Sequence, residues 1–244
     1  MTETKDTTLP LMPLRDMAPQ PGTTLPMFVG REKSKNAVRA AAAARTPILL
    51  VSQKSIAVEN PRPEDLYGVG ILGELNQVIE HPDGTIRIVV TSKARVYVRN
   101  VRVDHDYLRA DCADIQPTPA SADVTKAAKA ASKSFGAYCK VREDEMLGES
   151  RRLLGRLNEI QNQIQALRAA SESVAKLTDP NTVADLVPGC IHTQVQPDKL
   201  GDPEVVKMLD SRIRAKQAIL SEPDPAKRLQ LLRKFVEDQT TREL

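Results

Sequence analysis

The sequence predicts an α+β protein, with a β-rich lobe followed by an α-helical lobe that contains a long helix. Over residues 9–117, short apolar runs alternate with polar residues and are separated by Pro, Gly and Asp, as in strands joined by turns. After residue 122 the apolar spacing changes to about 3.6 residues, the helical period. We therefore expect a disordered tail over 1–8, the β-rich lobe over 9–117, a Pro-rich linker over 118–122 and the helical lobe over 123–244.

The β-rich lobe begins with a proline-rich segment. Leu9 to Phe28 carries five prolines among apolar residues, which suits short extended pieces near a sheet edge. Arg31 to Arg45 is Ala-rich and contains neither Gly nor Pro, so it predicts a helix. Pro47 ends that helix before a strand over Ile48 to Val51.

A β-hairpin is predicted next. Gly68 to Ile79 and Thr85 to Thr91 flank Pro82-Asp83-Gly84, where Asp-Gly favours the positive φ of a tight turn. The alternation then continues, with one face formed by Ile86, Ile88, Val90, Val96, Val98, Val101, Val103, Leu108, Ala110 and Cys112. The opposite face carries Arg95, Arg99, Arg102, Arg109 and Asp111. The pattern predicts a small, strongly bent sheet or barrel.

The helical lobe shows its clearest helix over 149–176. The apolar residues Leu153, Leu157, Ile160, Ile164 and Leu167 recur there at alternating steps of four and three. Such a stripe most often packs inside its own lobe, and an intermolecular coiled coil is the alternative, so these five are the candidates for an oligomer or partner contact.

Three Asp-Pro pairs punctuate the rest of the lobe. Asp179-Pro180, Asp202-Pro203 and Asp224-Pro225 each predict the start of a helix, because Asp caps and Pro fits the first turn. The last helix carries Leu229, Leu232 and Val236 on one face with Phe235 beside them, and needs a partner surface to bury them.

Composition narrows the function classes. Thirty-five basic and thirty-two acidic residues give a net charge of +3, far from the one-sided field that steers proteins onto nucleic acid. No basic start precedes an apolar run at the N-terminus, and no apolar stretch is long enough for a membrane span, so we expect no export signal and no membrane contact. The three cysteines, Cys112, Cys139 and Cys190, form neither a disulfide framework nor a metal pair, which fits the cytoplasm.

No motif supplies catalytic chemistry. No GxxxxGK[ST] phosphate-binding loop occurs, and the three histidines have no neighbour at helical spacing with which to share a metal. Cys139 lies next to Lys140, which stabilises a thiolate, yet a half-buried helix cysteine explains it better. We therefore expect no catalytic residue, no metal, no cofactor and no enzyme activity from this chain alone.

One segment resembles a known family. From Leu9 to Ser34 the chain reads LPLMPLRDMAPQPGTTLPMFVGREKS, similar to the start of Lon-type ATP-dependent proteases, whose pattern runs roughly LPxLPLRDxVxxPGxxxPLxVGREKS. ILLVSQK, DLYGVGILGEL, PDGTIRIVV and, near the end, PDPAKRLQLLRKFVEDQ continue the resemblance in order. It implies a β-rich, PUA-like lobe and a helical lobe. The segment from Phe135 to Asp179 is longer than the resemblance implies, which predicts an extended hairpin or arm.

The resemblance also implies a function. This region of the family binds unfolded or damaged protein substrates and helps the ring assemble, while the ATPase and the Ser-Lys peptidase lie further along the chain. The expected partners are therefore such clients, and either the rest of a Lon-type protease or further copies of this chain. The candidate client-binding residues are Met17, Pro21, Met27, Phe28 and Val29, although Met27, Phe28 and Val29 fit a core position equally well.

Two other functions stay open. A standalone adaptor could use the same scaffold to hold another protein. A PUA-like nucleic-acid-binding module could use the arginine face with Tyr97 and Tyr107, although that aromatic support is thin.

Overall fold

The structure, a computed structural model, describes residues 7–104, 106–115, 121–150, 157–191 and 202–242. These residues form a six-stranded sheet and helices, which confirms the α+β fold class. The chain divides into two compact units, Met1–Gln116 with His192–Ser221, and Pro117–Ile191 with Glu222–Leu244. Each unit is described by itself.

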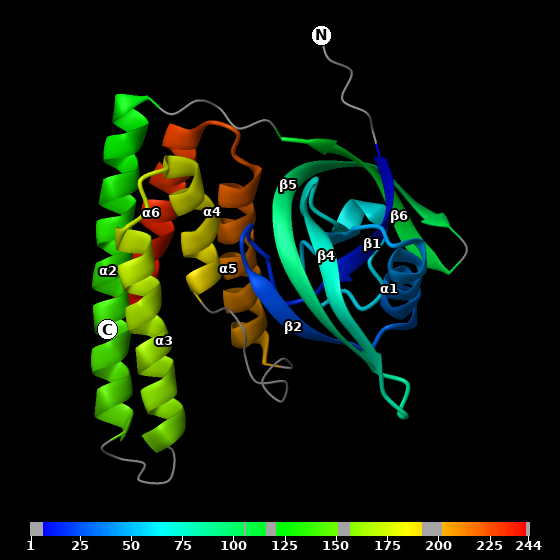
Figure 1. The fold of residues 1–244 in the computed structure, drawn as a ribbon, viewed down its shortest axis with the longest axis horizontal. Coiled ribbons are helices and arrows are strands. Elements are labelled where there is room, and N and C mark those ends of the chain that lie inside the picture. Colours follow the sequence, from blue (N-terminus) through cyan, green and yellow to red (C-terminus); the bar gives the residue numbers. More distant parts are fainter. Residues whose placement is uncertain (1–6, 105, 116–120, 151–156, 192–201, 243–244) are drawn as a thin grey trace. The chain divides into compact units, whose positions relative to one another are not determined.

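The first unit is a closed β-barrel with helices packed on it (Figure 1). Its elements are β1 (Thr7–Leu14), β2 (Thr24–Val29), α1 (Glu32–Ala44), β3 (Ile48–Ser52), β4 (Val69–Glu80), β5 (Ile86–Asp104), β6 (Tyr107–Asp114) and α5 (Pro203–Ser221). The strand order is β2-β5-β4-β3-β1-β6, and β5 also pairs with β6, which closes the barrel. Only β1 and β3 run parallel. The predicted bent sheet or barrel is confirmed.

The long strand β5 makes closure possible. It pairs with β4, and its second part also pairs with β6, which joins the two ends of the ring β5-β4-β3-β1-β6. Its first part carries β2, which lies outside that ring. The register shifts between Arg99 and Arg102, where Asn100 has a φ of 49°. Such a bulge bends the strand and changes which face its residues occupy. Val103 is consequently 59% exposed, so the simple alternation predicted the wrong side for it.

Strand β2 lies at the end of the strand order, because β5 is its only partner among the described strands. Pro26 occupies its centre, and proline is tolerated at an edge because no partner needs its missing N–H. The alternation of the strand buries Met27 and Val29 and exposes Thr24, Pro26 and Phe28. The edge position predicted for the proline-rich segment therefore holds for β2, whereas β1, from the same segment, lies inside the sheet between β3 and β6.

Two apolar clusters fill the first unit. The strands β1 and β3 contribute alternate residues to both, since they are buried on both faces: Met12, Leu14, Ile48 and Leu50 belong to one cluster, and Leu9, Leu11, Leu49 and Val51 to the other. Helix α1 adds Ala37, Val38 and Ala41 to the first. Close packing of strands also needs a glycine, because a Cβ on Gly70 would lie 2.8 Å from the backbone oxygen of Leu50.

Helix α5 belongs to the barrel unit, although the periodicity had placed it in one helical lobe over 123–244. Leu209 and Ile213 pack with Ala18 and Ile56. Polar contacts complete the attachment: Gln217 Nε2 donates to the carbonyl of Val69 at 2.6 Å, and Asp210 accepts from the backbone N–H of Ile56 at 2.9 Å. Helical periodicity indicates that one face of a helix is buried, but not which part of the protein covers that face. The sequence therefore could not assign α5 to the barrel unit.

The second unit is a helical bundle of α2 (Ala122–Ser150), α3 (Leu157–Ala175), α4 (Pro180–Cys190) and α6 (Pro225–Arg242). Helices α2 and α3 lie side by side (Figure 1) and run antiparallel, since Arg168 pairs with Glu143 while Ser171 lies near Gly136. The single helix expected over 149–176 is therefore two helices, and Glu149 belongs to α2. The apolar spacing does not reveal a chain reversal, because it is helical on both sides of it.

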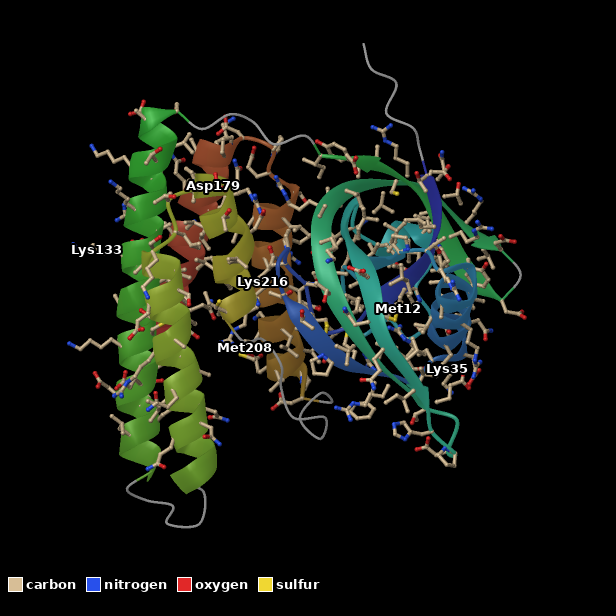
Figure 2. The ribbon with its side chains drawn as sticks, in the orientation of Figure 1. Met12, Lys35, Lys133, Asp179, Met208 and Lys216 are labelled. Atoms are coloured by element: carbon tan, nitrogen blue, oxygen red, sulfur yellow. The ribbon has the colours of Figure 1, made fainter. Side chains whose placement is uncertain are left out.

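The helix starts predicted from Asp-Pro pairs are confirmed. Asp179, labelled in Figure 2, accepts from the backbone N–H of Thr182 at 2.8 Å at the start of α4. Asp202 and Asp224 accept in the same way at the starts of α5 and α6. The last helix buries its predicted apolar face, Leu229, Leu232, Phe235 and Val236, against α2 and α4.

Candidate binding groove

An open groove of about 750 Å³ lies on the barrel unit where β1 ends, β2 runs and α1 begins. Its lining is largely apolar, with Met12, Leu14, Met17, Pro26, Met27, Phe28 and Val29. Met12, labelled in Figure 2, is on β1 and also part of the barrel core. Arg15, Asp16, Arg31 and Ser34 form the polar part of the lining. All of these residues come from the segment that carries the family resemblance.

The structure brings four of the five predicted client-binding residues to this groove. Met17, Met27, Phe28 and Val29 line it, whereas Pro21 is buried elsewhere. Met27 and Val29 are 7% and 4% exposed and belong to the barrel core, so a client would meet mainly Met17 and Phe28. Binding by any of the five stays a prediction.

Phe28 is the most exposed apolar side chain of the groove, at 75%. The guanidinium carbon of Arg87, its neighbour on β5, lies 5.9 Å from the ring centroid. The ring of His81 is 6.5 Å away from it, centroid to centroid. Cation–π and aromatic contacts favour one position of the ring, which reduces the entropy lost when it binds a partner.

Arg31 forms the base of the polar part. Its guanidinium donates to Gln53 Oε1 at 2.8 Å and to the carbonyls of Glu59 and Pro13, both at 3.0 Å. All three acceptors are neutral. Burial is the main cause that lowers the pKa of Arg31 below its usual value, and the nearby positive charge of Arg15 lowers it further.

A smaller hollow of about 270 Å³ adjoins the groove at the start of α1. It shares Pro13, Arg31 and Ser34 with the groove, and Glu32, Lys33, Glu59 and Pro61 complete the part nearest the helix. Sequence reasoning missed Arg31 and Ser34. The available signal was that no Ser, Thr, Asp or Asn occupies the position before the helix, where a capping side chain usually lies.

The predicted partner-helix residues have a different setting. Ile164 is buried within the helical unit and Leu167 is half-buried. Leu157 and Ile160 belong to α3, and Leu153 lies outside the described residues. Burial of Ile164 inside the unit favours packing over an intermolecular contact at that position.

Three of the four arginines proposed for nucleic-acid binding have partners inside the barrel unit. Arg95 is 9% exposed and donates to the carbonyl of Leu220 at 2.9 Å. Arg102 pairs with Asp111 at 3.1 Å, and Arg109 pairs with Asp104 at 2.8 Å. Arg99 lies over the ring of Tyr97 at 5.9 Å. Two of the four charges are thus paired with carboxylates, and Arg95 is buried, which weakens the cationic face on which that function depends.

The described residues also bear on two other kinds of site, a metal centre and a membrane-spanning helix. They contain no cluster of three or more His, Cys, Asp or Glu side chains arranged to hold a metal ion. Within the same residues, no helix has the length and apolar character that a membrane crossing requires.

Comparison with known proteins gives a consistent result. Residues 8–199 match the family described as ATP-dependent protease La (LON) substrate-binding domain. The Lon protease of Xanthomonas oryzae is 36% identical over 134 residues, which cover 54% of this chain and 16% of that protein. Lon protease 1 of Thermus thermophilus is 43% identical over 102 residues, covering 42% and 13% respectively. The matches thus cover about a sixth or less of these relatives.

A solved structure shares the fold. The N-terminal domain of the Mycobacterium avium complex Lon protease superposes with a TM-score of 0.60 at 18% identity. The superposition covers 95% of this chain and 99% of that one.

Proposed function

The chain belongs to the ATP-dependent protease La (LON) substrate-binding domain family, and from that premise we propose that it binds unfolded or damaged protein segments for a Lon-type protease. The groove on β1, β2 and α1 is the proposed contact surface. One observation supports this most strongly: the aromatic side chain of Phe28 is 75% exposed in a largely apolar groove. An exposed aromatic side chain at such a place is typical of binding surfaces.

The groove fits weak and promiscuous binding. Burial of apolar surface contributes roughly 25 cal/mol per Å², and ordering of a flexible client subtracts from that gain. Met17 suits clients of varied shape because the methionine side chain is flexible and polarizable. A client segment needs only a few apolar side chains to bind such a surface, and folded proteins rarely expose them.

Assembly and location belong to the same proposal. The matched region covers a small part of the relatives, so the remaining partner is an ATPase and peptidase on the same or another chain. A standalone adaptor would use the same groove, and the described contacts favour neither arrangement. A cytoplasmic location fits three cysteines that form no disulfide among the described residues, and it stays a prediction. The partnered arginines leave nucleic-acid binding without a supporting contact.

Replacement of Phe28 tests the groove. The variant Phe28→Ser should weaken binding of a reduced and alkylated, permanently unfolded protein about fivefold to tenfold, because the ring can no longer be buried against the client. Fluorescence anisotropy of the labelled client measures the dissociation constant. The folded form of the same client should bind wild-type protein at least about tenfold more weakly.

Val103→Ser is the matched control. Val103 is also an exposed apolar strand residue of the barrel unit, at 59%, but it does not line the groove. The variant Val103→Ser should therefore leave client binding unchanged. Equal affinity of wild-type protein for folded and unfolded client would refute client recognition, and equal loss in both variants would move the contact surface away from the groove.

A further inference from the structure

The start of α1 leaves backbone donors without partners in the helix. The first helical bond is donated by the N–H of Lys35 to the carbonyl of Arg31, so the N–H groups of Glu32, Lys33 and Ser34 precede it. Arg31 occupies the capping position and its side chain makes no capping hydrogen bond. Three amide donors therefore converge at the positive end of the helix dipole.

Ser34 points to a ligand independently of the helix end. The residue is 5% exposed and lines both the groove and the smaller hollow. Its hydroxyl has no hydrogen-bond partner within the part of the chain that the structure describes. Because Ser34 lines both hollows, its unpartnered hydroxyl can donate to an acceptor that a ligand supplies there.

Arg31 adds a half-buried positive charge. Its three hydrogen bonds use both N–H groups of Nη1 and one of Nη2, which leaves the Nε–H and the second Nη2–H without a partner among the described residues. None of its bonded acceptors is a carboxylate. Asp16 offsets part of its charge electrostatically without a hydrogen bond, so the two free N–H groups remain available to an anion beside them.

The charges around the two hollows leave room for one further anion. Arg15, Arg31 and Lys33 line them, together with Asp16, Glu32 and Glu59. Glu32 is already bound by Lys35, labelled in Figure 2, at 2.7 Å. Without Glu32, the three cations face only two carboxylates, those of Asp16 and Glu59, so the net charge of the lining is +1. The helix dipole adds to this positive charge.

From these observations we infer that the start of α1 binds the C-terminal carboxylate of a client polypeptide, while the last apolar side chains of the client lie in the adjoining groove. The donors are the N–H groups of α1, the Ser34 hydroxyl and the Arg31 guanidinium. This inference rests on the proposed function, because it concerns the same groove.

The mixed surroundings favour a peptide C-terminus over an inorganic anion. A phosphate would be bound best by several uncompensated cations in a polar pocket, whereas here Asp16 and Glu59 offset two of the three cations and the site adjoins a groove lined by Met12, Leu14, Met17 and Phe28. The C-terminus of a polypeptide places one carboxylate directly beside its last side chains. That arrangement matches an anion-binding helix start next to an apolar groove. Capture of chain ends by backbone amides is an established mode of peptide recognition.

The test compares peptides that differ only at the chain end. A short fluorescein-labelled peptide ending in Leu-Val-Leu is prepared as the free carboxylate, as the C-terminal amide, and as the amide extended by one Asp. Wild-type protein should bind the free carboxylate about tenfold more tightly than either amide, which corresponds to about 1.4 kcal/mol. Anisotropy titrations at low salt give the three dissociation constants.

Three variants assign the effect to its residues. Ser34→Ala should reduce the tenfold preference to about threefold or less, because one donor is lost while alanine keeps the helix. Ser92→Ala is the matched control, since Ser92 is also a buried serine with an unpartnered hydroxyl but lies outside the groove, and it should retain the full preference. Phe28→Ser should weaken all three peptides by one common factor.

The outcomes separate this inference from the proposed function. Equal affinity for carboxylate and amide overturns C-terminal recognition, even if the unfolded client of the previous section still binds. Equal affinity for the carboxylate and the Asp-extended amide also overturns it, because the site would then accept any carboxylate. If Ser34→Ala kept the full preference for the free carboxylate over the amide, the peptide carboxylate would bind away from the start of α1. Loss of unfolded-client binding as well would remove the proposed function itself.

Discussion

The sulfur of Cys139 shows how one residue's surroundings decide its chemistry. Its neighbour Lys140 made an activated thiol conceivable, but the residue is 4% exposed on α2 and therefore fully buried rather than half-buried. Burial above all, together with Cys190, raises the pKa of the Cys139 thiol to about 12, although a hydrogen bond with Ser171 opposes the shift in part. The thiolate needed for nucleophilic chemistry is thus absent near neutral pH.

We expect Cys139 to be inert in the folded protein. At about pH 8 its thiolate fraction is on the order of 10⁻⁴, so an aromatic disulfide reagent should not modify it until denaturant is added. Because the folded pKa is raised, the unfolded chain ionises first as the pH rises, so this group's stabilising contribution is lost between about pH 9 and 12. Thiol titration with and without denaturant measures the reactivity.

Cys139→Ser provides the control for that titration. This variant should lower by one the number of thiols that react in denaturant. The number of thiols that react in the folded protein should stay unchanged. Rapid modification of Cys139 in the folded protein would show that the helical unit opens there or that the thiol is activated.

Single residues also show what the sequence could and could not predict about the groove. Phe28 and Met17 were found because they lie in the segment that resembles the family. Met27 and Val29 could not be separated from Phe28 by composition, and only the alternation of β2 in its sheet assigns them to the core. Arg31 and Ser34 escaped notice because their role depends on a hollow formed by Pro13, Glu59 and Pro61, which are distant in sequence.

At the scale of elements, α3 decides between packing and assembly. Its candidate residue Ile164 is 5% exposed within the helical unit, while its neighbour Gln165 is exposed. Ile164→Asp should therefore destabilise that unit by about 3 kcal/mol or more, because a charged side chain would be buried without a partner. Urea denaturation followed by circular dichroism measures the loss.

Gln165→Asp separates burial from helix propensity. It introduces the same residue one position along the same helix, but on an exposed site, and should change stability by no more than about 0.5 kcal/mol. If Ile164→Asp left the unfolding curve intact and only lowered the molecular mass in sedimentation, the stripe would be an intermolecular contact instead.

Local elements were predictable where local rules fix them. The Asp-Gly turn forms as expected, with Gly84 at a φ of 78° and the N–H of Thr85 bound to Asp83 at 2.9 Å. The helix after Gly30 ends at Ala44, before Pro47. The break between α2 and α3 was not predictable, because a helical apolar stripe has the same spacing before and after a reversal.

At the scale of the whole chain, two features depend on distant contacts and were beyond sequence reasoning. Barrel closure requires β5 to pair with both β4 and β6, and the bulge near Asn100 that permits it has no strong local signal. The position of α5 in the barrel unit requires contacts across more than a hundred residues, such as Gln217 with Val69. The α+β class followed from periodicity, but the path of the chain between the units did not.

The membership of α5 can be tested by substitutions in two different helices. Leu209, on α5, is fully buried with Ala18, Ile56 and Ile213. Leu209→Asp should increase hydrogen exchange in the segment around Ile56 and in β4, because α5 no longer covers them, while α2 and α6 keep their protection. Mass spectrometry of peptides from exchanged protein resolves the two units.

Leu232→Asp is the reciprocal variant, because Leu232 is equally buried but lies on α6 in the helical unit. It should deprotect α2 and α4 and leave the barrel strands as they are. Each variant thus has its own pattern, and each serves as the other's control for general unfolding. If Leu209→Asp instead deprotected α2 and α6 first, α5 would belong energetically to the helical unit, as the sequence periodicity alone had suggested.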